Sequence, residues 1–280
     1  MTLPKIVGVY GGGRMGAGIA HAFLQSGTSV IVIENDAASA EAARERLQMS
    51  LSRAAEKDRL PGGFDDAIAR LTVAIAADEL VDAELVIEAV PEDLGIKASV
   101  LNKVVAVAPT AVLATNTSSL SVSALAGLLP NPANVIGLHF FNPVPASDLV
   151  EIVVGDDTGS ALVVEAQGWV ADLGKTAITV TDSPGFASSR LGVAIALEAM
   201  RMVEEGVATA ADIDTAMTLG YRHPTGPLKT TDIVGLDVRL AIAEHLAKEV
   251  SPRFEPPQIL RAMVAEGKLG RKSGQGFYAW

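Results

Sequence analysis

Short apolar runs alternate with longer helix-like segments over the first two thirds of the chain. The apolar runs are four or five residues long, as expected of buried strands, and they lie at residues 5–9, 30–34, 71–74, 85–88, 112–115, 135–139, 150–154 and 177–180. Helical spacing and helix-favouring composition mark residues 15–25, 37–59 and 161–173. Apolar strands that alternate with helices predict a doubly wound, mostly parallel sheet that is covered on both faces.

The pattern changes after the segment Thr181–Gly185, where strands stop and helices take over. One helical stripe is predicted from the spacing of Leu191, Ile195, Ala199 and Met202. Thr209, followed by Asp212 three residues later, is typical of a helix start, and Gly220 of a helix end. We therefore predict an α/β domain over residues 1–184 and a smaller, all-helical domain over residues 185–280.

A glycine motif follows the first predicted strand. Gly11, Gly13 and Gly16 have the G-x-G-x-x-G spacing at the start of a helix, and Glu34 ends the next strand. This arrangement is typical of a Rossmann-like site, in which the glycines and the helix N-terminus hold a dinucleotide pyrophosphate; Arg14 and Met15, between the glycines, belong to the same site.

Glu34 determines which dinucleotide this site favours. Its carboxylate would accept hydrogen bonds from ribose hydroxyls and repel a 2′-phosphate, which favours NAD over NADP. A glycine turn of some other α/β protein, with Glu34 as a solvated strand-end acid, is the alternative.

Composition narrows the class of protein. With 49% hydrophobic and 20% charged residues the chain is typical of a compact globular protein. The formal net charge of −11 disfavours a nucleic-acid-binding surface, so an anionic ligand needs a local basic patch. The absence of cysteine excludes disulfides, thiolate catalysis and Cys-ligated zinc, and we predict no metal site. No apolar run is long enough for a membrane span or a signal peptide, so we expect a soluble, cytoplasmic protein.

Candidate chemistry lies between residues 112 and 154. His139 ends a predicted strand on the side of the sheet where α/β proteins bind ligands, and Glu151 could hydrogen-bond its imidazole. A histidine oriented by a carboxylate is a suitable base for oxidising an alcohol while a hydride leaves to nicotinamide. By spacing alone His139 could equally be structural and Glu151 a surface acid, while Asn116 and Ser118 could be loop-capping residues.

Several longer motifs resemble a known family over nearly the whole length. They are Gly-Gly-Gly-Arg-Met-Gly-Ala-Gly-Ile-Ala from residue 11, Val-Ile-Glu-Ala-Val at 86–90, Asn-Thr-Ser-Ser-Leu at 116–120, His-Phe-Phe-Asn-Pro-Val-Pro at 139–145, Asp-Ser-Pro-Gly-Phe at 182–186 and Gly-Lys-Leu-Gly-Arg-Lys-Ser-Gly-Gln-Gly-Phe-Tyr at 267–278. Together they resemble the short-chain L-3-hydroxyacyl-CoA dehydrogenases, which include 3-hydroxybutyryl-CoA dehydrogenases of fatty acid metabolism.

The resemblance implies roles for individual residues. His139 matches the catalytic base, Glu151 its orienting carboxylate, and Ser118 a contact to both substrate and nicotinamide. The implied NAD contacts are Glu34, Glu92, Lys97, Ser118, Asn142 and Lys272. Ser50 and Lys57 match family contacts to the CoA portion of the substrate, and Arg53 and Arg59 add positive charge. The alternative is that these residues form an ordinary exposed helix face. The resemblance also implies a homodimer formed through the helical domain, and reversible oxidation of an (S)-3-hydroxyacyl-CoA to the 3-ketoacyl-CoA.

The sequence departs from the family pattern in two places. Ser189 stands where relatives usually have an asparagine near the reacting carbon, and Ala146-Ser147-Asp148 replaces larger apolar residues and a lysine. Loss of one well-placed oxyanion donor can cost on the order of 10²–10³ in rate unless another group replaces it. These departures leave two alternatives open: a related dehydrogenase acting on a carrier-protein-bound or other 3-hydroxy acid, and a non-catalytic NAD-binding protein.

Overall fold

The computed structural model describes residues 3–280 and divides them into two compact units. The first unit ends at Ser183 and the second runs from Pro184 to Trp280. Each unit has its own buried apolar cluster. None of the helices formed by the described residues is long and apolar enough to cross a membrane.

The first unit is built on one eight-stranded sheet with the order β3-β2-β1-β4-β5-β6-β7-β8. The strands are β1 (Ile6–Tyr10), β2 (Ser29–Ile33), β3 (Leu71–Ala74), β4 (Leu85–Glu88), β5 (Val112–Thr115), β6 (Val135–Phe140), β7 (Leu149–Val154) and β8 (Thr176–Thr181). Neighbouring strands are parallel except for β6 and β7. The doubly wound, mostly parallel sheet predicted from the sequence is confirmed.

The antiparallel β6–β7 pair follows from the short segment between the two strands. Only residues 141–148 connect them, and this connection holds a single 3₁₀ turn, η3 (Val144–Ala146), in place of a crossover helix. A parallel return requires a much longer crossover, so β7 runs back along β6. In this register His139 lies directly opposite Glu151.

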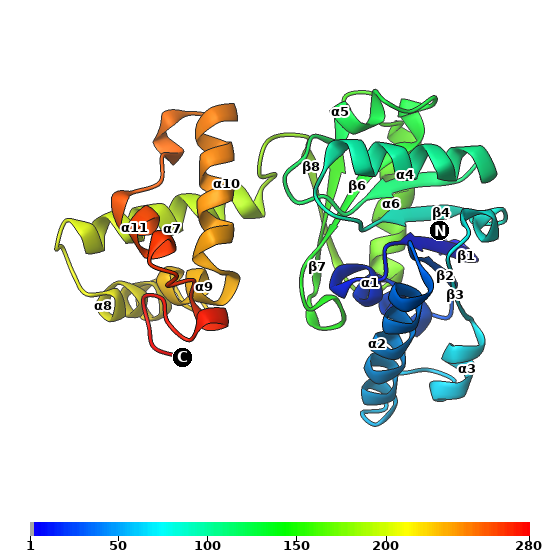
Figure 1. Cartoon of the computed structure of the whole chain (residues 1–280), viewed down its shortest axis with the longest axis horizontal. Helices are drawn as coiled ribbons and strands as arrows, with labels where there is room; N and C mark the ends of the chain where they lie inside the picture. The colour runs from blue at the N-terminus through cyan, green and yellow to red at the C-terminus, as the bar shows by residue number, and fades with distance from the viewer. Residues whose placement is uncertain (1–2) are drawn as a thin grey trace. The chain divides into compact units, whose positions relative to one another are not determined.

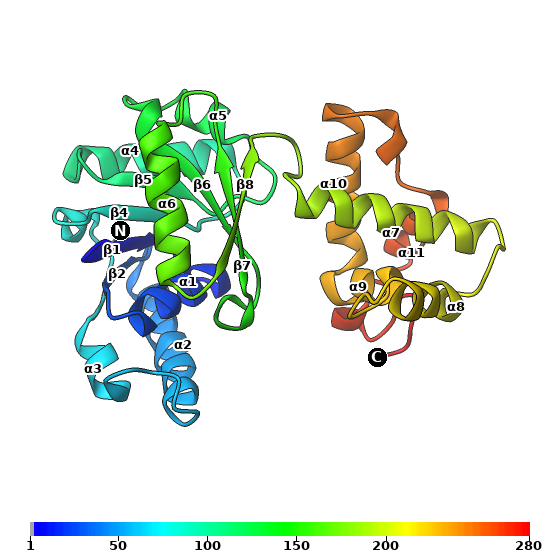
Figure 2. The ribbon, with the colours of Figure 1, turned by 180° about the vertical axis from the view of Figure 1, so that it is seen from behind.

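Helices cover both faces of the sheet, as Figures 1 and 2 show from opposite sides for α4 and α6. The helices of this unit are α1 (Arg14–Gln25), α2 (Ala37–Ala55), α3 (Gly63–Ala69), α4 (Leu94–Val107), α5 (Val122–Ala126) and α6 (Ser160–Asp172), with 3₁₀ turns η1 (Ala77–Leu80) and η2 (Pro132–Asn134). Burial on both faces explains the continuous apolar strands: all four residues of β4 are buried.

Helix α2 is shorter than the predicted segment 37–59. Asp36 begins it by accepting a hydrogen bond from the Ser39 N–H, and it ends at Ala55. Asp58 adopts a left-handed backbone conformation with φ 55°, which is incompatible with a continuing helix. Lys57 and Arg59 therefore lie in the turn after α2, where the composition had suggested a further helical turn.

The second unit is built from helices, and residues 184–280 contribute no strand to the sheet, which confirms the all-helical prediction. It consists of α7 (Ser188–Glu204), α8 (Ala210–Thr215), a π-helical turn η4 (Ala216–Gly220), α9 (Pro227–Val234), α10 (Leu236–Glu249), η5 (Pro252–Phe254), α11 (Gln258–Ala265) and η6 (Arg271–Ser273). Thr209 caps α8 by accepting from the Asp212 N–H, as predicted, and Gly220 ends the π-helical turn that follows α8.

The apolar stripe predicted on α7 is only partly buried. Ala199 is buried, but Leu191 and Ile195 are 64% and 38% exposed. The helix instead buries a neighbouring face, formed by Val193, Ala196, Leu197, Ala199 and Met200. The helix predicted from this spacing is present, but α7 has apolar residues on more than one face, and spacing alone does not say which face meets the core.

Candidate active site

The glycine motif forms an open groove at the start of α1. Gly11 has φ +95°, and a Cβ atom on Gly16 would collide with the Gly11 carbonyl oxygen. Nothing lies within 4 Å of a Cβ placed on Gly13. No side chain caps α1, and no acidic residue lies in its first turn, so its N-terminal amides are available to an anion. These features fit a bound dinucleotide pyrophosphate.

Glu34 closes one side of this groove. Its Oε1 accepts a hydrogen bond from the Gly12 N–H at 2.6 Å. The cavity, which we call the cofactor groove, measures about 430 Å³. It is lined by Tyr10, Gly11, Gly13, Arg14, Met15, Ile33, Glu34, Asn35, Ala89, Val90 and Pro91. The negative charge of this carboxylate makes that side of the groove unfavourable for a phosphate group.

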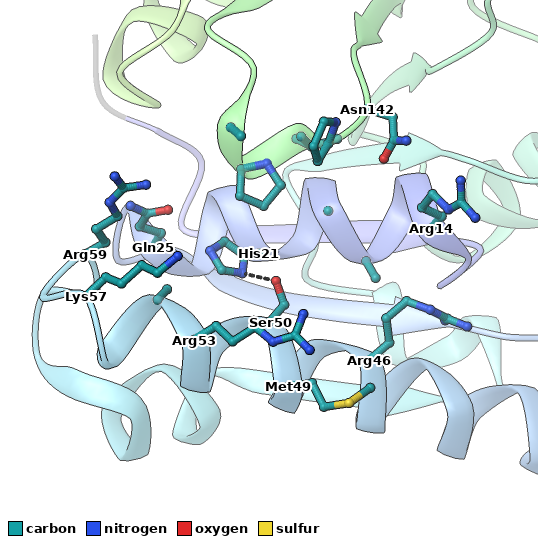
Figure 3. A pocket seen from close by; sticks show the side chains of 17 residues that line it. Arg14, His21, Gln25, Arg46, Met49, Ser50, Arg53, Lys57, Arg59 and Asn142 are labelled. Carbon is teal, nitrogen blue, oxygen red and sulfur yellow. Dashed lines mark hydrogen bonds between the residues drawn. The ribbon is translucent and has the colours of Figure 1, made fainter. Parts of the chain in front are cut away.

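A second cavity, of about 490 Å³, lies between α1, α2 and the segment after β6 (Figure 3). Its lining includes five cationic side chains, Arg14, Arg46, Arg53, Lys57 and Arg59. We call it the basic pocket. Asn142 and residues 143–146 form its opposite wall. In a chain of net charge −11, this concentration of positive charge is the local patch that an anionic ligand requires.

The floor of the basic pocket contains a histidine–serine pair. His21, on α1, is 2% exposed, and its Nδ1 lies 2.8 Å from the Ser50 hydroxyl of α2 (Figure 3). Burial lowers the pKa of His21, the charge of Lys175 lowers it further, and Gln25 opposes the shift. Ser50 was predicted from the family resemblance, whereas His21 was not, because a histidine within an apolar helix gives no signal in the sequence.

His139 and Glu151 form a buried pair across β6 and β7. The imidazole Nδ1 lies 2.7 Å from Glu151 Oε2, and the side chains are 9% and 0% exposed. A carboxylate at Nδ1 leaves Nε2 as the nitrogen that can exchange a proton with a ligand. Glu151 lies inside β7 as the third residue of the strand, two residues after its start.

Ser118 belongs to a loop that is organised by Glu92. The Glu92 Oε1 atom accepts hydrogen bonds from the Thr117 hydroxyl at 2.6 Å and from the backbone N–H groups of Ser118 and Ser119, both at 2.9 Å. Burial opposes ionisation of Glu92, but the charge of Lys97 and these hydrogen bonds outweigh it and lower the pKa to about 2. Glu92 thus sets the backbone position of Ser118.

Lys97 lies beneath this loop in a buried ion pair. Its Nζ is 2.7 Å from Glu88 and 3.2 Å from Glu92, and its side chain is 1% exposed. Glu88 also accepts a hydrogen bond from the Thr115 hydroxyl at 2.7 Å. Sequence reasoning did not identify Glu88, although an acid that ends an apolar strand is the same signal that pointed to Glu34.

Two polar side chains position the segment that follows His139. Asn116 Oδ1 accepts from the Phe140 N–H at 2.9 Å, which ties the Ser118 loop to β6. Lys175 donates to the carbonyl oxygens of Val144 and Ser147 at 2.8 and 2.5 Å. Burial lowers the pKa of Lys175, while the negative charge of Asp148 opposes that shift. Asp148 is exposed and does not line the basic pocket.

Two predicted site residues belong to the second unit. Ser189 is the second residue of α7 and is half-buried. Lys272, in η6, has its Nζ 2.6 Å from Asp237 Oδ2. Burial opposes ionisation of Asp237, but the Lys272 hydrogen bond prevails and lowers the pKa of this carboxyl. Among residues 3–280, no group of three or more His, Asp or Glu side chains is placed to hold a metal ion.

Both units match a single family. The NAD binding domain of 3-hydroxyacyl-CoA dehydrogenase matches residues 6–183, and the C-terminal domain of 3-hydroxyacyl-CoA dehydrogenase matches residues 185–280. The chain belongs to the 3-hydroxyacyl-CoA dehydrogenase family. The resemblance seen in the motifs is thereby confirmed, and the protein is an oxidoreductase with a family NAD-binding domain.

Individual relatives match over nearly their full length. A 3-hydroxybutyryl-CoA dehydrogenase from Mycobacterium tuberculosis is 42% identical over 281 residues, which cover 98% of both chains. A mitochondrial hydroxyacyl-coenzyme A dehydrogenase from Sus scrofa is 35% identical over 288 residues, covering 99% of this chain and 92% of the relative. The crystal structure of an (S)-3-hydroxybutyryl-CoA dehydrogenase from Ralstonia eutropha, 36% identical, superposes with a TM-score of 0.95 over 99% of both chains.

Proposed function

We propose that this member of the 3-hydroxyacyl-CoA dehydrogenase family oxidises an (S)-3-hydroxyacyl-CoA to the 3-ketoacyl-CoA and catalyses the reverse reduction. The observation that carries this proposal is the buried His139–Glu151 pair. The relatives named for 3-hydroxybutyryl-CoA support a short acyl chain. When bound, NAD supplies the acceptor for the hydride that leaves C3.

His139 is the proton acceptor in this mechanism. Oxidation breaks the O–H and C3–H bonds of the alcohol, and the hydroxyl proton passes to Nε2 of His139. Glu151 at Nδ1 fixes the ring orientation and stabilises the imidazolium that forms. Ser118, held by Glu92, hydrogen-bonds the oxygen at C3, and Ser189 is proposed as a second donor in place of the usual asparagine.

The basic pocket supports CoA as the carrier. A CoA thioester has a pyrophosphate and a 3′-phosphate, and Arg53, Lys57 and Arg59 provide matching positive charge beside Ser50. The resemblance assigns to the cofactor site the glycine motif with Arg14 and Met15, together with Glu34, Glu92, Lys97, Ser118, Asn142 and Lys272; of these, Lys97 would act indirectly. Since Lys97 is buried against Glu88 and Glu92, its contribution is to hold those carboxylates in place.

We further propose a domain of residues 1–184 that binds NAD, and a helical domain of residues 185–280 that forms a homodimer. The helical unit has large exposed apolar side chains, including Leu191, Leu219 and Tyr221, and these support a surface that a second copy of the chain covers. A cytoplasmic location agrees with the absence of cysteine.

The test is NADH consumption by the purified protein with acetoacetyl-CoA, with NADPH run alongside. We expect turnover that prefers NADH. Replacing His139 with Gln should lower kcat at least about 10²-fold while NADH binding, followed by fluorescence, is retained. His245→Gln, in the second unit, is the matched control. Turnover by H139Q close to that of the wild type would remove His139 from the role of base.

A further inference from the structure

Arg14 lies where the cofactor groove and the basic pocket meet. It is the first residue of α1, and of the residues described in the chain only Arg14 lines both cavities. Its side chain is exposed, and no carboxylate or carbonyl within residues 3–280 pairs with its guanidinium. Figure 3 shows it at the N-terminal end of α1, at the same end of the basic pocket as Arg46 and Asn142.

The other cationic side chains of this region line the basic pocket but not the cofactor groove. Arg46 Nη1 donates to the Gly12 carbonyl oxygen at 2.6 Å, so it supports the glycine loop from the basic pocket. Arg53, Lys57 and Arg59 line the basic pocket and do not reach the cofactor groove. Arg14 is therefore the cation that can act on ligands in both cavities.

The charge of Arg14 matters because both expected ligands are anions. A dinucleotide pyrophosphate in the groove and the phosphates of CoA in the basic pocket repel each other across α1. The guanidinium between them attracts both, and its planar set of donors can serve two phosphate groups at once. Its exposed side chain loses conformational freedom when the first anion binds, so the second anion meets a guanidinium that is already ordered, and this shared cost favours binding of both anions together.

We propose that Arg14 couples the two sites, so that bound CoA raises the affinity for NADH and bound NADH raises the affinity for CoA by the same factor. This inference rests on the proposed function, because it requires a dinucleotide in one cavity and CoA in the other. The two effects must be equal because they share a single coupling free energy. The coupling requires the phosphates of CoA and no acyl group, so free CoA is a sufficient ligand.

The experiment measures NADH dissociation constants by fluorescence titration, without CoA and with saturating free CoA. For the wild type we expect CoA to tighten NADH binding about fivefold or more, within the usual range of coupling between sites. In Arg14→Leu the ratio of the two constants should fall to about one. Arg53→Leu is the matched control: it should weaken CoA binding but preserve the ratio once CoA is saturating.

Three results would overturn the inference. They are a ratio of one in the wild type, a ratio that Arg14→Leu leaves unchanged, and a ratio that Arg53→Leu abolishes as completely as Arg14→Leu. Circular dichroism of Arg14→Leu checks that this exposed substitution leaves the fold intact. A wild type that binds neither NADH nor CoA would instead overturn the proposed function, and with it the coupling.

Discussion

The side chains of His139 and Glu151 meet across the β6–β7 pair, with 2.7 Å between Nδ1 and Oε2. The two residues are direct partners in the antiparallel register, so the backbone ladder itself holds the imidazole and the carboxylate together. Both strands belong to one sheet, so its backbone fixes the spacing between the two groups.

Glu151→Gln should therefore impair chemistry more than binding. An amide cannot stabilise an imidazolium by charge, and it can present an N–H that favours the wrong tautomer of His139. We expect kcat with acetoacetyl-CoA to fall at least about 10²-fold, with the NADH dissociation constant unchanged. Glu79→Gln removes an exposed acid of η1 and should have no effect. A normal kcat in E151Q would show that His139 needs no carboxylate.

Glu34→Gln should change the choice of dinucleotide. The substitution keeps an acceptor for the Gly12 N–H and for ribose hydroxyls but removes the charge that opposes a 2′-phosphate. We expect the ratio of the NADPH dissociation constant to the NADH dissociation constant to fall about tenfold, mostly because NADPH binds more tightly. Binding of both dinucleotides is measured by fluorescence, with Glu45→Gln on α2 as the control. An unchanged preference would place the discrimination elsewhere in the groove.

Glu92 should make stability depend on pH in the acid range. Its pKa in the folded protein is about 2, below the ordinary value of 4.5. The folded state therefore binds fewer protons than the unfolded state between these values. The stabilising contribution is fully present above about pH 4.5 and is lost as the pH falls toward 2.

Glu92→Gln should remove this contribution. Because the side chain is 36% exposed, solvent screening reduces the effect, and we expect a loss of about 1 kcal/mol in the free energy of unfolding at pH 7. The difference from the wild type should shrink as the pH is lowered from 5 toward 3. Urea unfolding at each pH measures this difference in the free energy of unfolding. A difference that stays constant with pH would contradict the lowered pKa of Glu92.

His21 and Ser50 should act as a unit in binding the substrate. His21 is buried and holds the Ser50 hydroxyl that lines the basic pocket. Ser50→Ala and His21→Leu should each raise KM for acetoacetyl-CoA about three- to tenfold, the value of one hydrogen bond, with kcat unchanged. The double variant should be no worse than the poorer single variant, because both lose the same contact. Additive effects would show that the two residues act separately.

The sequence by itself determined the fold class and the family. Alternation of apolar strands with helices required a covered, mostly parallel sheet, and the glycine motif with Glu34 predicted a dinucleotide site at the end of the first strand. The motifs at 116–120 and 139–145 were specific enough to indicate the family. These conclusions depend on local periodicity and on residue types at short spacing, which the chain carries without reference to its packing.

The tertiary structure decided how distant residues meet. The short segment between β6 and β7 accounts for their antiparallel direction, but spacing does not reveal the register that sets Glu151 opposite His139. Spacing also does not reveal that Glu92 holds the Ser118 loop, that His21 supports Ser50, or which face of α7 is buried. Each of these features depends on contacts between residues separated by 12 or more positions, or on a choice between similar helix faces. Only the packed chain decides them, because side-chain burial and hydrogen bonding must be satisfied for the whole fold together.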